Sequence, residues 1–433
     1  MPHASSDDER PTPVAAPAAP PRRHVVVIGC GFGGLQCAKA LRGTSVDVTV
    51  VDARDYHLFT PLLYQVASCL LNPSEIAAPI RKIFRGAPNV RYRQDEVVAL
   101  DTDTQRVSLA SGTVLEYDTC VVATGSVTTY YGIAAVEEHA LGLKDLREAL
   151  QLRNHVLERF EDASTADDAA ARLRLLTFCI VGGGPTGVEY AGALAEFVRL
   201  VVPAEYPELS AGDVRIVLLE GGEWVLPTFA PKLSTYTERE LTRMGVDVRT
   251  RTLVTAADAD GVVLHDGTEL PTATMVWTAG VRPNTPPGVP TDERAGRRME
   301  VDDHFLVVGT TGTYAIGDAA TGRGRHGEVL PMVSPVAMQA GRFVAGEILH
   351  GRGRRFRYRD KGTLATIGRT KAVGQVGRFT FTGFVGWVVW LGVHLWYLIG
   401  FENRLRVLMR WAWYYVRLDR PVRIVIRAGD RRR

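Results

Sequence analysis

The chain has 433 residues, of which 46% are hydrophobic and 23% are charged. It can therefore bury a large core, and it is too long for one ordinary domain. This composition excludes wholesale disorder. The five cysteines, at positions 30, 37, 69, 120 and 179, form no C-x-x-C pair and no Cys/His cluster. We therefore expect no zinc or other metal site, and a reducing compartment.

The net charge of +3 conceals a strong asymmetry along the chain. Residues 351–433 carry 19 Lys and Arg against 4 Asp and Glu, which leaves a net charge of −12 on residues 1–350. A basic tail on an acidic body indicates a negatively charged partner surface.

Residues 1–23 are rich in proline and alanine and lack the apolar stretch of a signal peptide, so we predict a disordered tail. The first regular elements follow directly. An apolar run over 24–28 is typical of a buried parallel strand. A helix is expected over 33–41 and a second strand over 46–51.

A glycine motif stands between the first strand and the helix. It is Gly29-Cys30-Gly31-Phe32-Gly33-Gly34, a G-x-G-x-x-G sequence, and Asp52 follows the second strand. In such a motif the first glycine makes the tight turn, the second lets the backbone approach a pyrophosphate, and the third lets the helix pack on the sheet. The acid accepts hydrogen bonds from a ribose. These features together predict a dinucleotide site.

The same pattern recurs in the second unit. A strand over 175–181 leads into Gly182-Gly183-Gly184-Pro185-Thr186-Gly187, and a helix is expected over 187–198. Residues 201–212 are expected to form a loop, before a strand over 214–219 that ends at Glu220. An acid at this position favours a free ribose 2′-hydroxyl, so NADH is expected rather than NADPH. Two such units predict an α/β flavoprotein with two Rossmann-like dinucleotide-binding domains.

Further segments resemble flavin disulfide-reductase-like oxidoreductases, namely 121–125 (VVATG), 277–281 (WTAGV) and 314–318 (YAIGD). The chain is more specifically similar to the type II NADH dehydrogenases, which are non-pumping NADH:quinone oxidoreductases. The segments that carry this likeness are 56–67 (YHLFTPLLYQVA), 182–189 (GGGPTGVE), 361–368 (KGTLATIG) and the aromatic tail. The resemblance covers about residues 24–427.

The resemblance implies FAD and NADH as cofactors, and it implies which residues hold them. The FAD residues would be Gly29, Gly31, Phe32, Gly33, Gly34, Asp52, Ala123, Thr124, Gly125 and Asp318. The NADH residues would be Gly182, Gly184, Thr186, Gly187, Glu220, Ala279 and Gly280. We expect an FAD-binding domain from 24–140 and 300–350, an NADH-binding domain from 141–299, and a membrane-association region from 351–433.

Three residues are candidates for catalysis. Glu189 resembles the family's glutamate on the nicotinamide side, although an acid early in a helix can also be stabilised simply by the helix dipole. Gln339 stands where the family places a quinone-side glutamine, with Pro335 where other members carry a second one. A solvent-facing helical residue is the alternative for Gln339. His394 can relay protons or serve in packing.

The C-terminal region predicts a membrane-associating helical segment. Residues 383–400 are eighteen uncharged residues, the short limit for a spanning helix, and they include three Trp. Residues 401–433 carry 10 basic and 3 acidic residues among aromatic and apolar ones, which favours an anionic lipid surface. Whether 383–400 spans the bilayer or lies flat stays open, and a homodimer interface is an alternative. No recognition motif indicates nucleic acid.

These features predict an FAD-dependent NADH:quinone oxidoreductase on the cytoplasmic face of the inner membrane. It would reduce ubiquinone or menaquinone without moving ions across the membrane. Cys69 has no cysteine within thirty residues on either side, so disulfide chemistry is not expected. Two alternatives stay open, a flavin reductase of a soluble protein acceptor and an NADH-sensing flavoprotein related to apoptosis-inducing factors.

Overall fold

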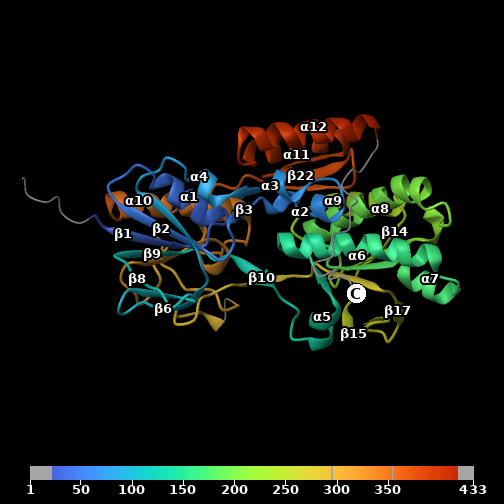
Figure 1. Ribbon diagram of the computed structural model, residues 1–433, viewed down its shortest axis with the longest axis horizontal. Helices are drawn as coiled ribbons and strands as arrows, with labels where there is room; N and C mark the ends of the chain where they lie inside the picture. Colours follow the sequence, from blue (N-terminus) through green and yellow to red (C-terminus); the bar gives the residue numbers. More distant parts are fainter. Residues whose placement is uncertain (1–21, 294–295, 354, 418–433) are drawn as a thin grey trace, which may run out of the picture.

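The computed structural model describes residues 22–293, 296–353 and 355–417. Most of the predicted tail at 1–23, and the basic residues beyond 417, lie outside the described residues. Figure 1 shows two α/β lobes with the two C-terminal helices lying along one side of the molecule, above the region where the lobes meet.

The first lobe is built on a five-stranded parallel sheet in the order β20-β9-β1-β2-β5. Its strands are β1 (His24–Ile28), β2 (Asp47–Asp52), β5 (Val90–Gln94), β9 (Thr119–Val122) and β20 (Thr313–Ala315). Two helices, α1 (Phe32–Ala40) and α10 (Ser334–His350), pack against each other beside this sheet. They approach so closely that a Cβ on Gly341 of α10 would lie 2.2 Å from the carbonyl oxygen of Gly33 in α1.

The second lobe repeats this design with a parallel sheet in the order β11-β18-β12-β13-β14. Its strands are β11 (Leu141–Gly142), β12 (Thr177–Val181), β13 (Arg215–Leu219), β14 (Val246–Arg249) and β18 (Thr274–Trp277). The helices that flank it are α6 (Leu146–Thr165), α7 (Ala169–Leu175), α8 (Pro185–Glu205) and α9 (Pro231–Arg243).

The prediction that 201–212 forms a loop is wrong for its first part. Helix α8 continues to Glu205 and contains Pro203. Val201 and Val202 are almost fully buried and extend the apolar face of the helix into the core. Their burial offsets the hydrogen bond that a proline removes from a helix interior.

Smaller elements connect and cover the two sheets. The further strands are β3 (Tyr56–Leu58), β4 (Ala77–Pro79), β6 (Val97–Asp101), β7 (Arg106–Leu109), β8 (Val114–Glu116), β10 (Ser126–Thr128), β15 (Val254–Ala257), β16 (Gly261–Leu264), β17 (Glu269–Pro271) and β19 (Val281–Pro283). The short helices are η1 (Thr60–Leu62), α2 (Leu63–Ala67), α3 (Pro73–Ile76), α4 (Ile80–Ile83), α5 (Ala134–His139), η2 (Ala211–Asp213) and η4 (Gly317–Ala319). Strands β10 and β19 pair antiparallel where the chain leaves the first lobe and returns to it.

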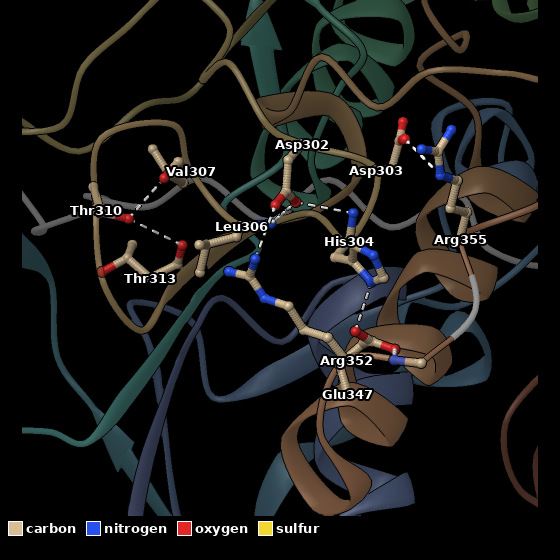
Figure 2. A network of polar contacts seen from close by, with 11 residues as sticks. Asp302, Asp303, His304, Leu306, Val307, Thr310, Thr313, Glu347, Arg352 and Arg355 are labelled. Carbon is tan, nitrogen blue, oxygen red and sulfur yellow. Dashed lines mark hydrogen bonds and ion pairs between the residues drawn. The ribbon is translucent and has the colours of Figure 1, made fainter.

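The chain that follows α10 is held on the first lobe by the polar network in Figure 2. His304 Nδ1 lies 2.7 Å from the carboxylate of Glu347, which is on α10. The flanking ion pairs are Arg352 with Asp302 at 3.6 Å and Arg355 with Asp303 at 3.3 Å. This anchoring fixes the point from which the C-terminal region starts.

The C-terminal region packs into the core of the second lobe. It contains the antiparallel strands β21 (Thr363–Thr366), β22 (Ala372–Val376) and β23 (Phe379–Thr382), then α11 (Gly383–Tyr397) and α12 (Phe401–Arg417). Trp390 of α11 and Val407, Trp411 and Tyr414 of α12 are almost fully buried. Among the described residues, no helix combines the length and the apolarity that crossing a bilayer requires.

Gly386 allows α11 to lie directly on β22, because a Cβ there would lie 2.5 Å from the carbonyl oxygen of Ala372. We expect Gly386→Ala to lower the free energy of unfolding by about 2 kcal/mol through overpacking. Gly392, in the same helix, has open space at its Cβ position. Gly392→Ala should be neutral or stabilising by up to about 1 kcal/mol, since alanine is the better helix former. Chemical denaturation of both variants checks this, and equal effects would contradict the close packing.

Candidate active site

The glycine motif of the first lobe leaves an open, uncapped helix N-terminus. Gly31 is the N-cap of α1, no side chain caps the helix, and its first turn contains no acid. A Cβ on Gly29 would lie 2.5 Å from the carbonyl oxygen of Ala123, and one on Gly34 would lie 1.9 Å from that of Gly29. A Cβ on Gly31 would meet nothing within 4 Å. The free N–H groups and the open space at Gly31 fit a dinucleotide pyrophosphate.

The second lobe has the same geometry. Gly184 is the N-cap residue of α8, and no side chain caps this helix. A Cβ on Gly184 would meet nothing within 4 Å. A Cβ on Gly187 would lie 1.9 Å from the carbonyl oxygen of Gly182, and Gly182 has φ +110°. Thr186 lies in the first turn of this helix. The two lobes therefore present two equivalent sites for a phosphate-linked nucleotide.

Ala279 and Gly280, which follow β18, lie against this second glycine loop. A Cβ on Gly182 would lie 2.7 Å from the backbone of Ala279. The hydroxyl of Tyr131 donates to the carbonyl oxygen of Ala279 at 2.8 Å. Gly280 has φ +151°, and a Cβ there would lie 2.3 Å from the same hydroxyl. A glycine is therefore required at 280.

The two acids at the strand ends each hold a glycine loop in place. Asp52 accepts from the backbone N–H of Cys30 at 2.6 Å. Glu220 accepts from the N–H groups of Gly183 and Gly222, both at 2.7 Å. Each carboxylate thus lies at the mouth of its own glycine loop, where a ribose hydroxyl would approach.

Asp318 lies in a junction of three chain segments. Its carboxylate accepts from the hydroxyl of Ser126 at 2.5 Å, and the ammonium of Lys144 donates to that same hydroxyl at 2.9 Å. Burial lowers the pKa of Lys144, and the nearby Asp318 opposes this effect. The hydroxyl of Thr124, beside Gly125, donates to the carbonyl oxygen of Asn284. Sequence reasoning did not select Ser126 or Lys144, because neither belongs to a recognisable local motif.

Glu189 is one of two buried acids on α8, the other being Glu196. Glu189 is only 8% exposed, and burial raises its pKa to about 8, so the carboxyl is largely protonated at neutral pH. The backbone N–H of Thr366 donates to its Oε1 at 3.1 Å. Glu189 is the fifth residue of α8 and the first turn of this helix contains no acid. Stabilisation by the helix dipole therefore does not explain its position.

Glu189 borders a small, partly open cavity of about 30 Å³, enough space for one or two water molecules. The walls come from α2, α8, β21, α11 and α12, and they include Tyr64, Gln65, Trp390 and Trp411. Sequence reasoning missed these four residues. Two lie in the segment 56–67 that carries the family likeness, but no local pattern separates them from ordinary core residues.

The other two candidate catalytic residues do not line this cavity. His394 is packed on Trp390, with ring centroids 4.1 Å apart, and its Nδ1 donates to the Trp390 carbonyl oxygen at 2.7 Å. Burial lowers the pKa of His394 to about 4, so the ring is neutral at physiological pH. The side-chain amide of Gln339 forms two hydrogen bonds with the backbone of Arg359. Its nitrogen donates to the carbonyl oxygen at 2.9 Å, and its oxygen accepts from the N–H at 3.0 Å.

Two glycine-capped dinucleotide sites on separate parallel sheets, with a buried acid on the second nucleotide-binding helix, define a two-domain flavin- and pyridine-nucleotide-dependent oxidoreductase. Residues 23–341 match the family described as pyridine nucleotide-disulphide oxidoreductase. The type II NADH:quinone oxidoreductase NdhA of Mycobacterium tuberculosis is 38% identical over 414 residues, which cover 90% of this chain and 87% of that protein. The type II NADH:quinone oxidoreductase Ndh of the same organism is 36% identical over 416 residues, covering 91% and 89%.

The chain belongs to the type II NADH:quinone oxidoreductases. The solved structure of Plasmodium falciparum NDH2 in complex with NADH shares its fold, with a TM-score of 0.86 at 20% identity over 94% of this chain and 100% of that one. The fold class and the family resemblance expected from the sequence are confirmed.

The open space at the two N-cap glycines allows the two sites to be tested separately. Gly31→Ala should fold, because its Cβ meets no protein atom, yet lose most of its FAD if the first glycine motif holds the pyrophosphate, since the methyl group would then occupy the pyrophosphate space. Gly184→Ala should keep its FAD and raise the KM for NADH by about tenfold or more. Flavin content and NADH titrations check both. Equal flavin loss in the two variants would contradict the assignment.

Proposed function

We propose that the chain catalyses NADH + H⁺ + quinone → NAD⁺ + quinol with bound FAD. The observation that carries this proposal is the position of Glu189. The N-terminus of α8 forms the second dinucleotide site, and the same helix brings the buried carboxyl of Glu189 to a cavity walled by the two C-terminal helices. A proton donor therefore lies between the nucleotide site and the surface from which a lipid-soluble quinone would arrive.

The two cofactors are assigned to the two lobes as the order of the motifs suggests. The first lobe would hold FAD, with its pyrophosphate at Gly31, its adenosine ribose at Asp52 and its ribityl chain at Asp318. The second lobe would hold NADH at Gly184 and Glu220. When bound, FAD accepts the hydride of NADH and passes two electrons to the quinone. The protein aligns the two ligands and excludes water.

Quinone reduction also needs protons, and we assign their delivery to Glu189. Its carboxyl is protonated at neutral pH and is next to space for water, from which it can be reprotonated. His394 is neutral and its Nδ1 proton is engaged with Trp390, so we assign it a packing role beside the cavity. Gln339 would support the site by holding the segment at Arg359, and direct contact with quinone would require those bonds to open.

The outer faces of α11 and α12 suit a lipid surface. Their exposed apolar side chains are Phe384, Val385, Val388, Val389, Val393, Trp396, Tyr397, Leu405, Leu408, Met409 and Trp413. Arg404, Arg406 and Arg410 accompany them on α12, and such a mixture favours binding to anionic lipid. We propose that this surface lies on the cytoplasmic face of the inner membrane. Pairing of two copies through it is the alternative.

The function is tested by anaerobic addition of NADH to the purified holoenzyme, followed by a short-chain quinone. NADH should bleach the flavin absorbance and the quinone should restore it. Glu189→Gln should bleach at the wild-type rate but recover at least about tenfold more slowly. The wild-type recovery should slow as the pH rises through about 8, because the protonated carboxyl is lost above its pKa. This fall in rate is the alkaline limb of the pH profile, and Glu189→Gln should lack it.

Glu208→Gln, at an exposed position, is the matched control and should follow the wild type. Bleaching without recovery would indicate that the electron acceptor is not a quinone. Recovery with an unchanged pH profile in Glu189→Gln would remove Glu189 from proton delivery.

Membrane binding is best tested on the exposed face rather than by truncation before Gly383, since truncation would also remove the buried Trp390 and Trp411. Phe384→Ser with Trp396→Ser should weaken sedimentation with anionic phosphatidylglycerol vesicles by roughly tenfold or more. Leu253→Ser with Val308→Ser, exposed apolar residues elsewhere, should leave it unchanged. If the first pair instead abolishes a dimer in analytical ultracentrifugation and leaves vesicle binding intact, this surface is a subunit interface.

A further inference from the structure

A continuous chain of hydrogen bonds runs from the last helix to Glu189. The buried indole of Trp411 in α12 donates to Gln65 Oε1 at 2.9 Å. The amide nitrogen of Gln65 donates to the hydroxyl of Tyr64 at 2.9 Å. That hydroxyl lies 2.9 Å from the hydroxyl of Thr366. The Thr366 hydroxyl lies 3.4 Å from Glu189 Oε1, which its backbone N–H also reaches.

The indole fixes the orientation of the Gln65 amide. An indole nitrogen can only donate, so the carboxamide oxygen of Gln65 must face Trp411 and the amide nitrogen must face Tyr64. The Tyr64 hydroxyl therefore accepts from Gln65 and has its own proton available for Thr366. Thr366 in turn can turn its proton towards Glu189. With Tyr64 as the donor to Thr366, every donor in this series of hydrogen bonds points towards the carboxyl.

Donors that point at a carboxyl favour its ionised form, whereas burial favours its protonated form. Burial is the stronger effect at Glu189, and the bonds from Thr366 and from the side chain of Trp390 oppose it. The other ionisable or charged groups facing the cavity are Tyr64 of α2, Glu196 of α8, Arg369 after β21 and Tyr414 of α12, and His394 of α11 lies behind Trp390. Glu196 is bonded by the Tyr414 hydroxyl at 2.8 Å and by the Arg369 backbone N–H at 2.6 Å.

The same helix face carries both contacts. Trp411 and Tyr414 are one turn apart on α12. Trp411 donates a hydrogen bond to Gln65, and Tyr414 donates one to Glu196. Only two residues from Trp411, Trp413 is 54% exposed and lies on the opposite, outward face. The series of hydrogen bonds to Glu189 is therefore complete only when α12 is docked.

We propose that Trp411 and Gln65 are positioning residues that aim the hydrogen bonds of Glu189, so that proton delivery to the quinone depends on the docking of α12. The proposal rests on the assigned role of Glu189 in quinone reduction. It explains why a helix whose outer face suits a membrane has an inner face that ends in polar contacts next to the candidate proton donor.

Trp411→Phe removes the one donor that sets the direction, and Gln65→Leu interrupts the chain without changing α12. In the holoenzyme, both should move the alkaline limb of quinone reduction upward by about 0.5 pH unit or more, because the ionised carboxylate loses support. The KM for NADH and the reduction of ferricyanide, which bypasses quinone, should not change. Trp413→Phe makes the same substitution on the outer face, and with a soluble short-chain quinone its alkaline limb should lie at the wild-type pH, whatever its effect on lipid binding.

An infrared titration supplies a readout that does not depend on turnover. The carboxyl band that Glu189→Gln removes should titrate at higher pH in Trp411→Phe and Gln65→Leu than in the wild type. Unshifted profiles and an unshifted band in both variants would overturn the proposal, even if thermal unfolding shows that α12 has loosened. If Glu189→Gln loses the alkaline limb but Trp411→Phe and Gln65→Leu shift nothing, the proposed function stands and only this inference fails. An unchanged limb in Glu189→Gln would reject its proton role and this inference together.

Discussion

The close approach of two helices to two parallel sheets is the constraint on which the rest of the structure depends. At Gly34 and Gly187 a single Cβ would lie 1.9 Å from a backbone oxygen, so each helix can start where it does only with glycine there. This contact places the N-cap glycines Gly31 and Gly184 at open space with free N–H groups. The packing requirement and the ability to bind a phosphate therefore come from the same few atoms.

A second consequence is that α8 serves two sites. Its N-terminus lies at the second glycine loop, while its fifth residue, Glu189, is already buried beneath the C-terminal region. The apolar surroundings that close this region are the reason that the carboxyl holds its proton at neutral pH. The proposed proton donor and the proposed nucleotide site are thereby kept at a fixed separation by one helix.

The C-terminal region combines two environments that a simple anchor would not need. Trp390, Trp411 and Tyr414 face inward and complete the walls of the Glu189 cavity, whereas Trp396 and Trp413 face outward. Docking of α11 and α12 therefore completes the cavity and creates the exposed apolar surface at the same time. In this arrangement, the proposed contact with a lipid surface and the geometry around the proposed proton donor depend on the same pair of helices.

The sequence alone determined the two glycine motifs, the acids Asp52 and Glu220, the fold class and the family, because these depend on local spacing that a strand, a turn and a helix must satisfy. It did not show that α8 continues past residue 198, since only tertiary burial stabilises a helix through Pro203. It also did not select Ser126, Lys144, Gln65 or Trp411. Trp411 meets a residue 346 positions earlier in the chain, and only the folded structure brings such distant groups within hydrogen-bonding distance.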